Sequence, residues 1–168
     1  MSISSHAGDK GSVNWVSIRV HRERAHESTC KRLCDGNPQI FRFLKDLMVF
    51  AALVAYSRGE RRPLEYQSQE DLIRIELGTY ASDESDGYIY LLGLLDLKDA
   101  NSLRDNKLND VVQVFEEYCN AGLYMIKEWL DDNPESLDGV ETLLNIIQEE
   151  LVANQPAESS GEAPISIV

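Results

Sequence analysis

The chain has 168 residues, of which 43% are hydrophobic, and its net charge is −13. This length predicts one domain with tails, and so negative a charge argues against broad, non-specific binding to DNA. The longest nearly apolar run, residues 47–56, is far shorter than the ~20 residues that cross a bilayer, so we expect no membrane contact.

The charge is divided unevenly along the chain. Residues 1–74 hold 12 Lys and Arg against 9 Asp and Glu, whereas residues 75–168 hold 4 against 20. The acidic part fits either a solvated surface with local ion pairs or a basic protein partner, and the basic N-terminal third offers a DNA contact. The odd cysteine count and the absence of a signal peptide predict a cytoplasmic protein. The cysteines are Cys30, Cys34 and Cys119.

The first half of the chain predicts a strand and two helices between residues 13 and 64. Residues 1–12 are small and polar and predict a disordered tail. Alternating apolar residues indicate a strand at 13–20, and the basic stretch after it predicts a helix at about 22–34. The apolar residues of 40–57 fill more than one helix face, which is typical of a buried helix. Gly59 suits the positive φ that follows a helix end, and Pro63 prevents its continuation.

The second half predicts three more helices. Helix and strand patterns compete at 68–77, where we expect a short helix or an extended piece. Residues 81–87 predict a loop, 88–97 a second buried helix, 106–131 an amphipathic helix and 137–152 a last helix, before a disordered tail at 153–168. Gly122 predicts a kink or a close helix contact. The helical domain at 13–152 is thus a mainly α, single-domain bundle of about five helices, with at most a small β element near the N-terminus.

Three arginines after the first buried helix are the best functional candidates. Arg58, Arg61 and Arg62 stand within five residues in an otherwise acidic chain. Guanidinium groups so placed could bind phosphate or an acidic partner, and Tyr56 and Tyr66 could add stacking. The alternative is an internal cluster of ion pairs with the acidic half of the chain.

Cys30 and Cys34 are separated by three residues. Together with His21 and His26 they make up a set of four residues of the types that bind zinc. No standard zinc-finger spacing is present, which favours ordinary half-buried thiols.

Two acidic groups also fail to form a recognisable site. The first group is Asp83, Glu84 and Asp86. Its residues lack the twelve-residue spacing of a calcium-binding loop, so a solvated loop is the favoured interpretation. The second group is Asp105, Asp110, Glu116 and Glu117. It would form the site of a metal-dependent nuclease only if these carboxylates converged beside Lys107. A helix N-terminus and a solvent-facing helix surface explain these residues more simply, so no catalytic residue, metal or cofactor is predicted.

Three blocks of sequence resemble a known bacterial family. They are residues 40–64 (IFRFLKDLMVFAALVAYSRGERRPL), 87–94 (GYIYLLGL) and 114–130 (VFEEYCNAGLYMIKEWL). In this order they are similar to the Dnd system-associated protein 4 family, which accompanies DNA phosphorothioation. The resemblance implies a non-enzymatic accessory or adaptor subunit of an antiphage defence system, whose partners are other proteins of that system. It supplies no catalytic residues.

Other functions stay open beside this one. A nucleic-acid-binding regulator or sensor would use the basic third and the three arginines. A metal-dependent nuclease would need converging carboxylates, and a DNA mimic would need carboxylates spaced like phosphates. A homo-oligomer is compatible with each of them.

Overall fold

A computed structural model describes residues 14–153 of the chain. These residues form six α-helices and one two-stranded sheet, which confirms the mainly α bundle with a small β element near the N-terminus. The predicted tail at 1–12 lies outside the described residues, as does the tail predicted at 153–168 except for Ala153, which is the last residue of a helix. The helices are α1 (Glu27–Cys34), α2 (Leu44–Ser57), α3 (Leu77–Ala81), α4 (Asp86–Leu97), α5 (Leu108–Asp132) and α6 (Val140–Ala153).

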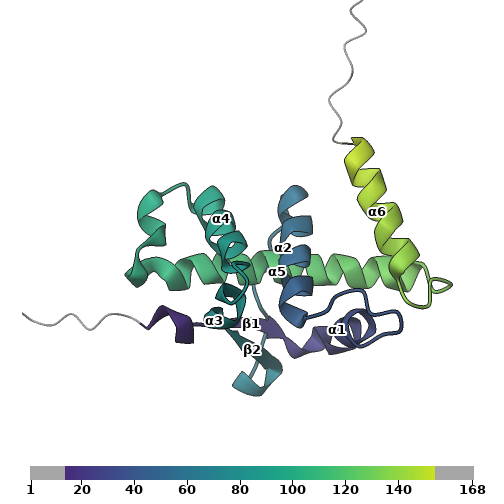
Figure 1. The fold of residues 1–168 in the computed structure, drawn as a ribbon, viewed down its shortest axis with the longest axis horizontal. Coiled ribbons are helices and arrows are strands. Elements are labelled where there is room, and N and C mark those ends of the chain that lie inside the picture. The colour runs from purple at the N-terminus through teal and green to yellow at the C-terminus, as the bar shows by residue number, and fades with distance from the viewer. Residues whose placement is uncertain (1–13, 154–168) are drawn as a thin grey trace, which may run out of the picture.

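The helix α5 is the axis on which the other elements pack. Figure 1 shows α2 and α4 rising on one side of α5, with α1 and the two strands lying along its other side. The last helix, α6, leaves the C-terminal end of α5 and projects beyond α2. None of the helices in the described part is long and apolar enough to cross a membrane.

The closest approach in the core joins α2 to α5 at Gly122. An added Cβ at Gly122 would lie 1.9 Å from the backbone oxygen of Ala51, so only glycine lets the two helices cross here. This confirms the close helix contact expected at Gly122. The fully buried side chains of both helices belong to one core, namely Leu47, Met48, Ala51, Ala52 and Ala55 of α2 and Val111, Phe115, Cys119, Leu123 and Ile126 of α5.

The strands β1 (Arg19–Glu23) and β2 (Leu72–Glu76) pair antiparallel, with His21 opposite Arg74. The first strand therefore begins and ends later than the predicted 13–20, because pairing is available only where β2 lies beside it. The predicted helix at 22–34 is shortened to α1 for the same reason. At 68–77 the extended alternative is correct for β2, which α3 then follows.

Two predictions for the apolar helices need correction. The helix α2 begins at Leu44 rather than 40, because the backbone N–H groups of Ile40 and Phe41 both donate to the carbonyl oxygen of Leu33 and hold this segment against α1. The helix α4 is not buried on all sides. It buries Ile89 and Leu92 but leaves a stripe of apolar side chains exposed. The stripe consists of Tyr88, Leu91 and Leu95.

Candidate functional site

Each of the three arginines has an acidic or aromatic partner within the chain. Arg58, at the end of α2, pairs with Glu150 of α6, and its guanidinium carbon lies 4.8 Å from the ring centre of Trp129 on α5. Gly59 follows with φ +68, as predicted, and its N–H donates to the carbonyl of Tyr56. Arg58 therefore links the ends of three helices.

Arg61 joins α4 to α5. Its Nε donates to Glu117 across 2.6 Å, and its Nη1 pairs with Asp96 near the end of α4. Asp96 also accepts from the hydroxyl of Tyr118 across 2.7 Å. Both carboxylates belong to the acidic half of the chain, so Arg61 forms the internal ion pairs that were the alternative to an anion site.

Arg62 packs against Tyr124 of α5. Its guanidinium carbon is 3.8 Å from the ring centre of Tyr124, and its backbone N–H donates to the carbonyl oxygen of Glu117 across 3.1 Å. Its Nη2 is 3.3 Å from Glu65. Binding of an external anion by the three arginines stays a prediction, and an anion would have to compete with these contacts.

A buried polar network that the sequence analysis missed lies beneath Arg62. The carboxylate of Glu23 is 3% exposed and accepts from the amide of Asn120 (2.9 Å), the hydroxyl of Tyr124 (2.9 Å) and the backbone N–H of Glu65 (2.7 Å). The side-chain oxygen of Asn120 lies 2.7 Å from Nε2 of His26. Burial lowers the pKa of His26, although its bond to Asn120 opposes this. Asn120 within an apolar helix stretch was the signal available in the sequence.

A polar cleft of about 550 Å³ lies between the sheet, the segment after α2 and the first half of α5. In its wall, Oε1 of Glu116 is 2.7 Å from Nδ1 of His21 and also accepts from the backbone N–H of His21 across 2.7 Å. Burial raises the pKa of Glu116, against the opposing effect of His21. Arg19 and Tyr66 line the same cleft.

Three of the carboxylates considered for a nuclease, Asp110, Glu116 and Glu117, do not converge on a metal site. Glu116 and Glu117 are held against His21 and Arg61 rather than on a solvent-facing surface, which corrects the sequence interpretation. Asp110 is exposed and 3.5 Å from Lys107. Within residues 14–153, no group of three or more His, Cys, Asp or Glu is placed to hold a metal ion.

The thiols lie in the core, more buried than predicted. Burial raises the pKa of both Cys30 and Cys34 to about 11, and raises that of Cys119 well above its usual value. His21 and His26 contact Glu116 and Asn120 instead of the thiols.

The loop with Asp83 and Glu84 is exposed, as expected, but Asp83 also has a structural contact. It pairs with Lys45, whose side chain is 6% exposed. That hydrogen bond lowers the pKa of Asp83 to about 2.

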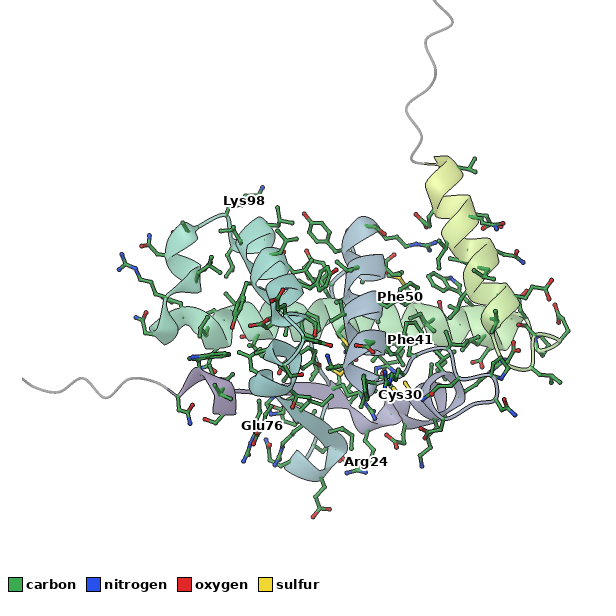
Figure 2. All side chains as sticks on the ribbon, in the orientation of Figure 1. Arg24, Cys30, Phe41, Phe50, Glu76 and Lys98 are labelled. Atoms are coloured by element: carbon green, nitrogen blue, oxygen red, sulfur yellow. The ribbon has the colours of Figure 1, made fainter. Side chains whose placement is uncertain are left out.

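An apolar groove of about 340 Å³ lies between α2, the end of α5 and α6. Phe50, labelled in Figure 2, is on the side of α2 that faces α6. The apolar side chains that line the groove are Phe50, Leu53, Val54, Trp129, Leu143, Ile146 and Ile147. Ile147 is exposed, and the acid–base pair of Arg58 with Glu150 lies at the groove wall.

The model of the family described as DNA sulphur modification system-associated protein 4 matches residues 19–162. The chain belongs to this family. Comparisons with curated proteins and with solved structures found no significant match.

The family match extends from the first residue of β1 beyond the last residue of α6. The arginines, the polar cleft and the apolar groove therefore all lie in the region shared with the family. Membership associates the chain with a DNA sulphur modification system.

Proposed function

We propose that the chain is a non-enzymatic accessory subunit of a bacterial DNA-phosphorothioation-linked antiphage defence system, and that it works by binding another protein of that system. Family membership supports the setting. The observation that carries the binding role is the apolar groove between α2, α5 and α6, whose floor includes the partly buried Trp129 and the exposed Ile147. Open apolar grooves of this kind are typical of protein-binding surfaces.

The charge distribution favours a protein partner over DNA. The arginines predicted to bind phosphate already contact Glu150, Glu117 and Asp96, or stack on Trp129 and Tyr124. DNA binding would require free cations over a continuous surface, whereas the second half of the chain is strongly acidic.

Co-purification tests this function. The tagged chain is expressed with each protein encoded beside it, and we expect one of them to co-elute in a fixed ratio. A parallel gel shift uses plain and phosphorothioated duplexes at about 50 mM salt, where electrostatic binding is strongest. We expect no shift with either duplex. Failure of every neighbouring protein to bind, together with a DNA shift, would replace the adaptor by a nucleic-acid-binding regulator.

A cleavage assay tests the non-enzymatic part separately. The purified chain is incubated with both duplexes and Mg²⁺ or Mn²⁺, the ions that assist phosphodiester hydrolysis. We expect both duplexes to stay intact. Cleavage that is lost in Glu116→Gln but retained in the surface variant Asp110→Asn would show a nuclease.

A further inference from the structure

We propose that the groove between α2, α5 and α6 binds a basic amphipathic helix of a partner protein. This inference rests on the proposed function and adds to it the surface and the chemistry of the partner. The groove is lined by residues 50–57 of α2 and 143–150 of α6, so each wall is about 12 Å long, or about two helical turns. A helix docked along them would place apolar side chains at positions i, i+3, i+4 and i+7 against the groove floor.

The acidic segment that contains α6 and the end of α5 specifies the polar face of that helix. Between residues 128 and 153 the chain has eight Asp and Glu and no Lys, Arg or His. Lys127 pairs with Asp131, and Arg58 pairs with Glu150. Six of these carboxylates have no cationic partner within the described residues. They are Glu128, Asp132, Glu135, Asp138, Glu141 and Glu149. Glu150 lines the groove itself, whereas Glu135, Asp138 and Glu141 line another hollow on α6, so most of this charge acts on a docked helix from the surrounding surface.

The position of the negative charge at helix ends points to the same partner. Asp131 and Asp132 are the last two residues of α5, where the helix dipole disfavours a carboxylate. Neither α5 nor α6 has a basic residue in its last turn. Lys and Arg supplied by a partner would offset this repulsion, while its apolar side chains cover the groove.

The same charge disfavours other occupants of the groove. A second copy would bring its own acidic α6 against the acidic residues 128–153. The chain's own residues 154–168 carry Glu158 and Glu162 and no Lys or Arg. Both arrangements place like charges together, whereas a basic helix complements the acidic segment.

A synthetic peptide provides a direct test. The peptide has about 18 residues, with Leu at i, i+3, i+4 and i+7 and Lys at most other positions. A scrambled peptide of the same composition has no apolar face, and a third peptide replaces Lys by Glu. The full chain carries Trp15→Phe, so that Trp129 in the groove reports binding by its fluorescence. We expect the Leu/Lys peptide alone to change the emission of Trp129.

Matched variants locate the binding on one face of α6. Ile147→Glu puts a charge in the groove and should weaken binding of the Leu/Lys peptide about tenfold or more. Leu144→Glu changes an exposed leucine that lines another hollow on α6 and should leave the affinity within about twofold. Neutralising Asp132 to Asn and Glu149 to Gln should reduce both the affinity and its salt dependence, whereas Glu70→Gln with Glu76→Gln on the sheet side should not.

Several results would overturn the inference. These are equal binding of the scrambled peptide, stronger binding of the Leu/Glu peptide, or unchanged affinity in Ile147→Glu. A dimer in sedimentation that Ile147→Glu dissociates would assign the groove to a second copy. Tighter peptide binding after removal of residues 154–168 would assign it to that segment.

The two proposals fail in different ways. If a protein of the system co-purifies equally with the wild-type chain and with Ile147→Glu, the groove is not its docking surface, but the accessory function stands. If none co-purifies with the wild-type chain, the accessory function fails whatever the peptide does.

Discussion

The side-chain amide of Asn120 donates to the buried carboxylate of Glu23 across 2.9 Å and so ties the centre of α5 to the end of β1. No Lys or Arg forms an ion pair with this carboxylate among the described residues; its other donors are Tyr124 and a backbone N–H. A buried charge held by neutral donors depends strongly on each of them.

Asn120→Ala should therefore destabilise the fold by about 2–3 kcal/mol, because the Glu23 carboxylate loses a donor and His26 loses its partner. Urea unfolding followed by circular dichroism measures the change. Asn145→Ala on the exposed face of α6 is the control and should stay within about 0.5 kcal/mol. Equal stability of the two variants would contradict the importance of the network.

Gly122→Ala should destabilise the protein by roughly 3 kcal/mol or more, because its methyl group would meet the backbone oxygen of Ala51 and force α2 away from α5. The melting temperature and urea midpoint report the loss. Gly87→Ala on α4 has open space around the new methyl group and should be neutral or slightly stabilising. If both substitutions destabilised the protein by a similar amount, the close contact between α2 and α5 would not be the cause of the effect at Gly122.

His26 should make the fold less stable in mild acid. Burial lowers its pKa below the 6.5 of an exposed histidine, so the unfolded chain binds the proton more readily. Stability therefore falls as the pH drops through about 6.5. His26→Gln keeps a donor for Asn120 and does not titrate. We expect a smaller loss of unfolding free energy between about pH 7.5 and 5.5 in this variant than in the wild type. Parallel slopes would rule out His26 as the titrating group.

The three cysteines should resist alkylation in the native protein. Burial raises the pKa of Cys30 and Cys34 to about 11, so little thiolate exists at neutral pH, and Cys119 is fully buried. Mass spectrometry after brief iodoacetamide treatment should find unmodified native protein and three modified cysteines in urea. Ser82→Cys, at an exposed position, provides the reactive control. Rapid modification of native Cys34 would contradict its burial.

Arg61 and Glu117 should be energetically coupled. A double-mutant cycle with Arg61→Gln and Glu117→Gln should give about 1–2 kcal/mol, a value reduced because Arg61 is 34% exposed. The exposed pair Lys127–Asp131 is the control, with an expected coupling of about 0.3–0.5 kcal/mol. A coupling energy no larger than the control value would mean that Glu117 does not hold Arg61, and that Arg61 is available to the predicted anion site.

The helices were predictable because their signal is local. Periodic apolar residues gave the approximate bounds of α5 and α6, and Gly59 with Pro63 marked the end of α2. The strands were harder to place because β1 and β2 are about fifty residues apart in sequence, and the bounds of each depend on the other. The exposed apolar stripe on α4 also could not be predicted, because the sequence of that helix is apolar on every side and does not indicate which side is buried.

The contacts of the candidate site were largely beyond sequence reasoning. The residue types suggested that Arg61 would meet the acidic half, but not that its partners would be Glu117 and Asp96. His21 and Glu116 are separated by 95 residues, and no local motif joins them. The groove was hidden because Trp129 and Ile147 follow the same periodicity as residues of a closed core.

The length of α5 also determines how far the polar cleft lies from the apolar groove. Its 25 residues extend about 37 Å, and about 18 Å of that length separates Glu117 in the polar cleft from Trp129 in the apolar groove. No residue lines both hollows. A helix docked on the groove would therefore leave the cleft open, because α5 keeps the two hollows apart.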